Sequence, residues 1–195
     1  MRLAIFGGSF DPPHIGHLLA AEDAFDQLSL DRMALVPAAT QPLKVGRAVA
    51  TAQQRLAMTR LLVEGDARFE VSSVEVDRAG LSFMVDTLGD FADAYPSAER
   101  FLLIGADVLA TFAQWREPER VLRLARPVVL QRQGEHPATG MMTGDAAGTS
   151  FLRLETRRVD VSSTEIRERV RLGKPIRGFV TDSVAAFIAR DGLYR

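Results

Sequence analysis

The sequence predicts an α/β protein with a Rossmann-like, doubly wound parallel sheet and C-terminal helices. Three observations predict it: short apolar runs alternate with amphipathic segments, two glycines follow the first apolar run directly, and polar residues follow several of the others. The chain has 195 residues, of which 47% are hydrophobic and 25% charged. This length and composition suit one buried core, so we expect a single domain over residues 1–195.

Apolar runs and helix caps predict the elements in chain order. Leu3–Phe6 ends at Gly7-Gly8, which is typical of a buried parallel strand. Thr51 with Gln54 three residues later predicts a capping box, and Ser82 is the expected N-cap of the following helix. The predicted strands cover residues 3–6, 33–36, 70–76, 100–104 and 127–130. The predicted helices cover residues 15–28, 51–63, 82–94, 117–124, 163–172 and 181–190, and residues 133–150 predict a surface loop.

Charge and composition argue against several classes of protein. Lys and Arg number 24 and Asp and Glu 25, and this balance disfavours non-specific nucleic-acid binding. The chain has no cysteine, which excludes disulfides, thiolate metal sites and cysteine nucleophiles. No apolar run approaches the ~18 residues of a membrane span. The apolar stretch at the N-terminus is too short for a signal peptide. We therefore expect a cytoplasmic protein without nucleic-acid or membrane partners, and a homo-oligomer stays open.

Four polar segments follow predicted strands. They are residues 7–17 (GGSFDPPHIGH), 37–44, 105–107 and 131–132. Because ligands of open parallel sheets bind at the carboxyl ends of the strands, we expect these segments to converge on one site.

The 7–17 segment carries the strongest functional signal. Gly7 and Gly8 after a strand let backbone N–H groups approach an anion, and the following helix adds the partial positive charge of its N-terminus. His14 and His17 lie three residues apart, on one face of the first helical turn. An ordinary glycine-rich turn does not need two histidines at this spacing. The pattern therefore predicts a phosphate-binding segment.

Residues 162–167 are a second candidate phosphate site. Ser162 and Glu165 match a capping box, which needs no ligand. The hydroxyls of Ser163 and Thr164 and the guanidinium of Arg167 add donors that suit phosphate. The same residues can cap the helix and bind phosphate.

Two of these motifs carry a family resemblance. GGSFDPPHIGHL resembles the (H/T)xGH signature of the nucleotidyltransferase superfamily. LIGADVLATFAQW at 103–115, VSSTEIRERV at 161–170 and the C-terminal IARDGLYR extend the similarity over nearly the whole chain. Within the superfamily the chain resembles the bacterial nicotinate-nucleotide adenylyltransferases. The resemblance implies a nucleotidyltransferase domain that transfers AMP from ATP to nicotinate mononucleotide in NAD biosynthesis, giving deamido-NAD and pyrophosphate. It also implies that Mg²⁺ accompanies ATP, without a metal site built by the protein.

The resemblance implies a role for each matching residue. The expected catalytic residues are His14, His17 and Arg167, and either histidine is expected to be cationic beside the triphosphate. The implied ATP-binding residues are Gly7, Gly8, Ser9, Phe10, His17, Gly105, Asp107, Ser162, Ser163, Thr164 and Arg167. The implied substrate-binding residues are Ser9, Asp11, Lys44, Ser82, Phe83, Met84, Trp115 and Arg132. Trp115 is expected to stack on the pyridine ring, and Asp11 to orient a histidine or a metal-bound water.

Two departures from the family pattern keep alternatives open. Leu43 stands where many relatives carry a histidine, so a phosphate contact there depends on Lys44 alone. Met84 stands where relatives carry a threonine, at a helix start that is similar to the one receiving the nicotinate carboxylate. The alternatives are an adenylyltransferase that prefers nicotinamide mononucleotide or phosphopantetheine, and a non-catalytic nucleotide sensor. His14 and Trp115 count against phosphopantetheine.

Overall fold

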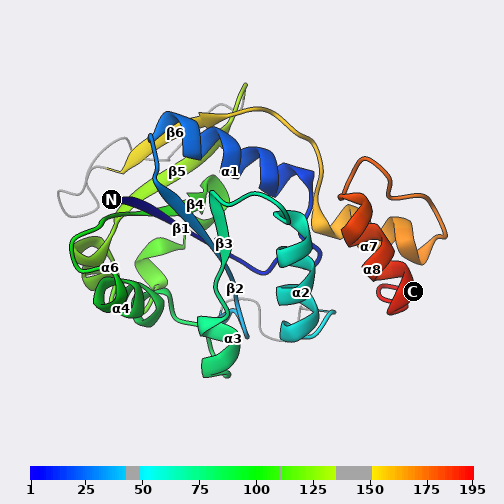
Figure 1. Ribbon diagram of the computed structural model, residues 1–195, viewed down its shortest axis with the longest axis horizontal. Coiled ribbons are helices and arrows are strands. Elements are labelled where there is room, and N and C mark those ends of the chain that lie inside the picture. The colour runs from blue at the N-terminus through cyan, green and yellow to red at the C-terminus, as the bar shows by residue number, and fades with distance from the viewer. Residues whose placement is uncertain (43–48, 110, 135–150) are drawn as a thin grey trace.

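A computed structural model describes residues 1–42, 49–109, 111–134 and 151–195. Six parallel strands form one sheet in the order β3-β2-β1-β4-β5-β6 (Figure 1). They are β1 (Arg2–Gly8), β2 (Arg32–Pro37), β3 (Phe69–Val71), β4 (Glu99–Gly105), β5 (Arg126–Arg132) and β6 (Leu152–Thr156). This order reverses direction between β1 and β4, which is where Rossmann-like folds bind ligands. The predicted fold class is confirmed.

Helices cover both faces of the sheet. They are α1 (Ile15–Gln27), α2 (Ala52–Leu62), α3 (Val74–Arg78), α4 (Met84–Ala94), α5 (Ala106–Leu109), α6 (Pro118–Leu124), α7 (Ser163–Arg171) and α8 (Asp182–Arg190), with a 3-10 turn η2 (Phe112–Gln114). Figure 1 shows α4 and α6 side by side, away from α1 and α2, while α7 and α8 lie together at the C-terminal end. Among the described residues, no helix is long and apolar enough to cross a membrane.

The strands β1, β2, β4 and β5 are buried on both faces, which explains why they appear as continuous apolar runs. In β1, Ala4 and Phe6 pack into a core shared with α1, α2, α7 and α8. Their neighbours Leu3 and Ile5 point to the opposite face and pack with α4 and α6. Successive side chains of a strand alternate between faces, so a central strand needs apolar residues at every position.

Two local predictions were wrong, both because of tertiary contacts. The predicted strand 70–76 is a three-residue edge strand followed by α3, which begins at Val74. The Val-Glu-Val alternation has the period of a strand, but Glu75 is buried in a helix, where the Thr87 hydroxyl donates to it at 2.6 Å. Ser82 does not cap α4, whose N-cap is Phe83; its hydroxyl instead accepts a hydrogen bond from the backbone N–H of Ala39 at 2.9 Å.

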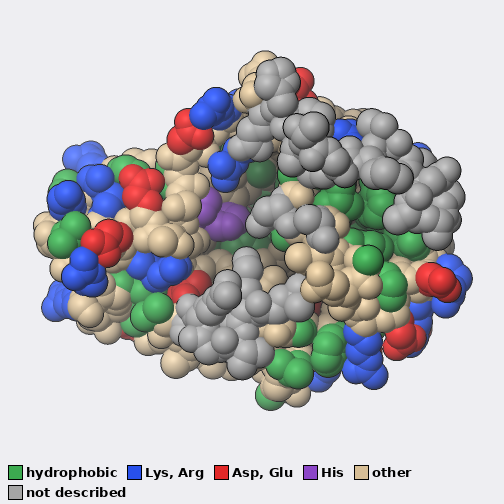
Figure 2. All heavy atoms as spheres, turned by 180° about the vertical axis from the view of Figure 1, so that it is seen from behind, with side chains coloured by type: hydrophobic (Ala, Val, Ile, Leu, Met, Phe, Trp, Pro, Cys, Tyr) green, Lys and Arg blue, Asp and Glu red, His purple; other side chains and the backbone are tan. Residues whose placement is uncertain are grey.

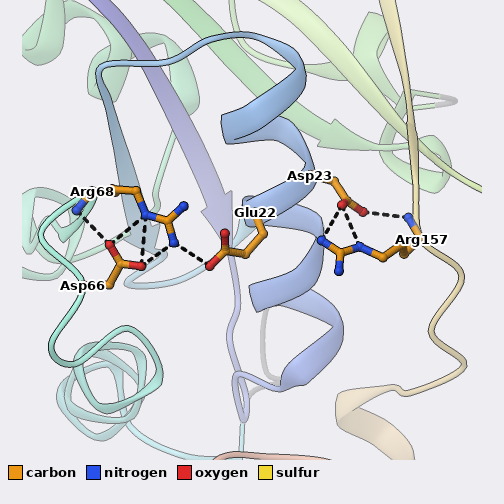
Figure 3. A network of polar contacts seen from close by, with 5 residues as sticks. All are labelled: Glu22, Asp23, Asp66, Arg68 and Arg157. Atoms are coloured by element: carbon orange, nitrogen blue, oxygen red, sulfur yellow. Dashed lines mark hydrogen bonds and ion pairs between the residues drawn. The ribbon is translucent and has the colours of Figure 1, made fainter.

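Adjacent acidic residues of α1 fix this helix to two other segments (Figure 3). Glu22 accepts a hydrogen bond from Arg68 at 2.8 Å, and Asp66 binds the same guanidinium at 2.6 Å. Asp23 accepts from the backbone N–H and the Nε of Arg157 at 2.7 and 2.8 Å. Arg68 directly precedes β3, and Arg157 directly follows β6. The network therefore holds in register the helix that carries His17 in its first turn.

Candidate active site

The 7–17 segment leaves β1 in a tight turn whose conformation depends on its own side chains. A Cβ at Gly8 would lie 3.0 Å from the Phe10 ring, so a glycine permits this close approach. Phe10 has a φ of 49°, a left-handed conformation that is strained for a non-glycine residue. Its ring is buried and packs edge-on against Phe6 at 5.8 Å and His17 at 5.0 Å between centroids. This packing stabilises the turn and connects Gly8 to the histidines.

His14 and His17 lie against one another at the start of α1. Their ring centroids are 3.8 Å apart, and Nδ1 of His17 accepts a hydrogen bond from the His14 backbone N–H at 3.2 Å. A neutral imidazole whose Nδ1 accepts carries its proton on Nε2, so Nε2 of His17 is a donor. Nδ1 of His14 is buried without a hydrogen-bond partner among the described residues. A Cβ at position 16 would come 3.0 Å from that atom, which explains why a glycine suits this position.

The environment of the two imidazoles favours their neutral forms. Burial and then the charge of Arg132 lower the pKa of His14 to about 4. Burial, followed by the neighbouring His14 and Arg132, holds the pKa of His17 well below its usual value. Without a ligand, these lowered pKa values favour the uncharged imidazoles at neutral pH, and the cationic form expected beside a triphosphate stays a prediction. The pair presents hydrogen-bonding groups, and the nearby positive charge belongs to arginine.

The N-terminus of α7 is attached directly to the 7–17 segment. The Ser163 hydroxyl donates to the backbone carbonyl of Pro12 at 2.8 Å, and Nη1 of Arg167 donates to that of Asp11 at 2.7 Å. Nη2 of Arg167 also donates to Thr164 Oγ1 at 3.2 Å. Ser162 is the predicted N-cap, and its hydroxyl accepts from the Glu165 backbone N–H at 3.1 Å. The two predicted phosphate-binding segments are therefore neighbours.

A cavity of about 340 Å³, called here the aromatic pocket, opens where the strand order reverses. Its floor is the carboxyl ends of β1 and β4, and its walls come from the start of α4 and the segment around η2. It is lined by Gly7, Gly8, Ala38, Gln41, Pro42, Glu75, Ser82, Phe83, Met84, Leu102, Leu103, Ile104, Gly105, Val108, Thr111, Gln114, Trp115 and Arg116. Apolar walls with few polar groups are typical of a site for a flat organic ring.

Trp115 supplies the large aromatic surface of this pocket. Its ring lies 5.1 Å from that of Phe112, which packs edge-on against Phe151 at 5.4 Å and so supports it from behind. Arg116, the next residue, lies over the Phe83 ring at 4.9 Å and pairs with Asp86 at 3.7 Å. No motif in the sequence points to Arg116. Its guanidinium lies at the wall formed by the α4 start, beside the carboxylates of Asp86 and Glu117.

Sequence reasoning also missed two buried charged residues: Glu75, which lines the pocket, and Arg55. Arg55 is 2% exposed and donates to the carbonyls of Ser9 and Ala39, both at 2.8 Å. Glu75 is 3% exposed, and burial raises the pKa of its carboxyl against the lowering effect of hydrogen bonds from Thr87 and Ser82. An arginine inside a helix reads from sequence as a solvated side chain. Only the fold reveals that it joins the 7–17 segment to the loop after β2.

Two predicted site residues, Asp11 and Ser9, make hydrogen bonds within the protein. The Asp11 carboxylate is 4% exposed and accepts hydrogen bonds from the backbone N–H groups of Val49 and Ala50 and from the Tyr194 hydroxyl. It therefore orients neither histidine directly. The Ser9 hydroxyl donates to Gln41 Oε1 at 2.8 Å, so Gln41 is a further residue at this place.

The remaining predicted residues fall into three groups. His14, His17 and Arg167 lie together with residues 162–164 and Phe10 at one end of the site. Seven predicted residues line the aromatic pocket: Gly7, Gly8, Ser82, Phe83, Met84, Gly105 and Trp115. Lys44, Leu43 and the side chain of Asp107 lie outside the described residues, as does most of the predicted 133–150 loop. Figure 2 shows the histidines (purple) recessed in a hollow, with Lys or Arg side chains (blue) nearby.

Comparisons with known proteins agree with this geometry. Residues 5–169 match the cytidylyltransferase-like family. A "probable nicotinate-nucleotide adenylyltransferase" of Gemmatimonas aurantiaca is 51% identical over 198 aligned positions, which cover 100% of this chain and 93% of that protein. One of the same name from Thermus thermophilus is 43% identical, with 100% of both chains covered.

Solved structures show the same fold. The Plasmodium falciparum nicotinic acid mononucleotide adenylyltransferase complexed with NaAD aligns with a TM-score of 0.74 at 15% identity, covering 99% of this chain and 97% of that one. The same enzyme complexed with APC gives a TM-score of 0.75. At this identity the likeness concerns the fold, whereas the full-length sequence relatives define the family. The chain therefore belongs to the nicotinate-nucleotide adenylyltransferase family of cytidylyltransferase-like nucleotidyltransferases.

Proposed function

We propose that this enzyme transfers the adenylyl group of ATP to nicotinate mononucleotide, giving deamido-NAD and pyrophosphate. One observation carries the proposal: the aromatic pocket and the histidine pair meet at a single turn. Gly7 and Gly8 line the pocket, and Phe10 connects Gly8 to His17 through close contacts. A mononucleotide whose ring occupies the pocket would place its phosphate along this turn, next to the ATP phosphates at the histidines and α7.

The pocket suits a nicotinate ring for two reasons. The Trp115 face favours flat stacking, and it also attracts the positive charge of a pyridinium. Within the described residues, no side chain caps the N-terminus of α4, and Arg116, which lies 3.7 Å from Asp86 and 3.8 Å from Glu117, brings guanidinium donors to the same wall. Both features favour an anionic substituent on the ring. The threonine hydroxyl that Met84 replaces is therefore not the sole source of carboxylate recognition.

The reaction requires the two phosphate groups to be positioned against each other and does not require a general base. A phosphate monoester has its second pKa near ~6 and is largely dianionic at neutral pH. One of its oxygens attacks the α-phosphorus of ATP, forming a P–O bond. The bond between the α-phosphorus and the bridging oxygen breaks, and its electron pair leaves with pyrophosphate. The protein has to hold two polyanions together and stabilise the charge that moves between them.

The described residues meet these requirements with donors and fixed arginines. We propose that Nε2–H of His17 and the imidazole of His14 donate to the α- and β-phosphate oxygens as charge develops. Even a neutral imidazole carries one N–H, so neither histidine needs a protonation step before it can donate. Arg132 and Arg167, with the N-terminus of α7, supply the positive potential.

Nucleotidyltransferases of this kind generally use a divalent metal ion with ATP. Among the described residues, no three His, Cys, Asp or Glu side chains are grouped to hold a metal. Both oxygens of Asp11 already accept hydrogen bonds. We propose Mg²⁺ as the ion, held by the ATP phosphates and water, because Mg²⁺ commonly binds in this way. It would neutralise part of the phosphate charge.

The test is pyrophosphate release from Mg·ATP with three acceptors offered in parallel: nicotinate mononucleotide, nicotinamide mononucleotide and phosphopantetheine. We expect rapid release with the nicotinate compound and much slower release with the other two. Faster release with nicotinamide mononucleotide would keep the reaction but replace the acceptor. ATP binding without release from any acceptor would favour a nucleotide sensor.

A further inference from the structure

The C-terminal turn of the chain contacts the 7–17 segment at Asp11. The Tyr194 hydroxyl donates to Asp11 Oδ1 at 2.7 Å, although the two residues are 183 positions apart. Tyr194 is 7% exposed and Asp11 is 4% exposed, so water does not compete freely for this bond. The adenylyl-transfer chemistry proposed above uses neither group directly.

Asp11 joins four segments of the chain. Besides Tyr194, its carboxylate accepts from the backbone N–H groups of Val49 at 2.8 Å and Ala50 at 3.1 Å, just before α2. Its backbone carbonyl accepts from Arg167 of α7 at 2.7 Å. A buried carboxylate needs several donors, and Tyr194 is the side-chain donor in this set. Burial and the bond to Asp11 raise the pKa of Tyr194, which keeps the phenol protonated and able to donate.

A second C-terminal contact lies on the other side of the histidine turn. The backbone N–H of Ile15, the first residue of α1, donates to the Phe179 carbonyl at 2.9 Å. Residues 12–14 therefore lie between C-terminal contacts at Asp11 and at Ile15, and Ser163 contacts the Pro12 carbonyl between them. Both contacts adjoin the start of α1, where the two imidazoles lie.

We propose that Tyr194 is a positioning residue for the transfer reaction: through Asp11, its hydroxyl fixes the direction in which His14 and His17 face the ATP phosphates. The proposal rests on the proposed function for its kinetic consequence. It also has a structural consequence that does not depend on turnover.

The experiment compares Tyr194→Phe with Tyr95→Phe. Tyr95 is the other tyrosine of the chain; its ring stacks on Phe91, and its hydroxyl makes no hydrogen bond within the described residues. Each variant loses one phenolic oxygen and keeps its ring. We expect Tyr194→Phe to lower kcat at least tenfold, with the KM values for ATP and nicotinate mononucleotide changed less than threefold. We expect Tyr95→Phe to change kcat less than twofold.

Two readouts separate positioning from a general loss of structure. Turnover is measured per active site, by single-turnover pyrophosphate release, at a temperature where each variant is fully folded. The imidazole nitrogen signals of His14 and His17 are followed by NMR, with His136 as the reference. We expect both signals to shift in Tyr194→Phe and not in Tyr95→Phe. Asp11→Asn combined with Tyr194→Phe should cost less than the product of the two single losses, since both remove one interaction.

The outcomes decide the proposal in every case. Unchanged turnover per site in Tyr194→Phe, or an equal loss in Tyr95→Phe, would overturn it. If the wild-type enzyme releases no pyrophosphate with any acceptor, the proposed function fails, and the NMR comparison then decides alone. Unshifted signals of both imidazoles would overturn the positioning role.

Discussion

The 7–17 segment and the aromatic pocket meet at Gly7 and Gly8, but they are held in different ways. The 7–17 segment is held by hydrogen bonds from distant parts of the chain, including Ser163, Arg167 and Tyr194. The pocket walls near Trp115 and Met84 consist mainly of side chains that pack against each other. On the proposed function, we expect the first region to set the geometry of the reacting phosphates and the second to set affinity for the ring. Substitutions should separate kcat effects from KM effects along this boundary.

The largest expected effect is at the phosphate end. His17→Ala removes a donor that acts on developing charge, and loss of one such donor typically costs about 10²–10³-fold in kcat. The KM for nicotinate mononucleotide should change less than about threefold, because the aromatic pocket is intact. Steady-state pyrophosphate release measures both parameters. His17→Gln, which keeps an amide donor, serves as the matched variant and should retain more turnover than His17→Ala. A His17→Ala enzyme with normal kcat would remove His17 from the mechanism.

The next effect concerns stability in acid. The pKa of His14 is lowered to about 4, so between pH 6.5 and 4 the unfolded chain binds more protons than the folded one. The free energy of unfolding should therefore decrease as the pH is lowered from 6.5 to 4, by ~3 kcal/mol for this residue. Urea unfolding at pH 7 and pH 4.5 measures the loss, and His14→Gln should show a smaller one.

Glu75 of the aromatic pocket provides the control, because the pH dependence of its contribution to stability is opposite to that of His14. Burial raises the pKa of the Glu75 carboxyl in the folded protein. The free energy of unfolding therefore decreases as the pH rises through this raised pKa and the buried carboxyl ionises. Glu75→Gln should consequently leave the acid-side loss in place. Equal acid sensitivity of His14→Gln and the wild type would show that His14 does not titrate in this way.

A smaller effect is expected when the pocket aromatic is removed. Trp115→Ala should raise the KM for nicotinate mononucleotide about tenfold, or ~1.4 kcal/mol, because ring stacking is lost. The change in kcat should be much smaller, since the 7–17 segment is unaffected. Trp115→Phe should recover part of the affinity. A loss confined to kcat would contradict the division between the two regions.

The smallest effect concerns the choice between acid and amide. Met84→Thr places a hydroxyl at the start of α4, and one added neutral hydrogen bond is worth roughly 0.5–1.5 kcal/mol. The ratio of kcat/KM for nicotinate over nicotinamide mononucleotide should rise about threefold or more. Competition between the two acceptors in one assay measures this ratio directly. A constant ratio would assign carboxylate recognition to the α4 backbone and Arg116.

Much of the fold follows from local patterns in the sequence. The strand β1 and the helix α1 are where the apolar run and the following spacing predicted them. The capping box of Thr51 and Gln54 is present at the start of α2, and Thr181 caps α8 where that helix was predicted to begin. These features depend on residues a few positions apart, so periodicity and caps are sufficient to predict them.

Local patterns fail where a side chain is satisfied by a distant partner. Glu75 is buried because Thr87 and Ser82 donate to it, and Arg55 because carbonyls from two other segments surround its guanidinium. Neither arrangement leaves a signal in the residues beside it. The same is true of the Asp11 carboxylate, which accepts a hydrogen bond from the distant Tyr194 hydroxyl. Its assignment to the substrate stays a prediction.

The sequence by itself determined the parallel α/β class, the 7–17 and 162–167 motifs, and through them the family. Glycines after a strand and paired histidines at a helix start are local chemistry, readable in chain order. Only the tertiary structure decided the charge state of those histidines, because burial and the proximity of Arg132 set their pKa values. It also decided that the Tyr194 hydroxyl donates a hydrogen bond to Asp11 in the 7–17 segment. Both depend on which groups are desolvated together, and that is a property of the folded chain.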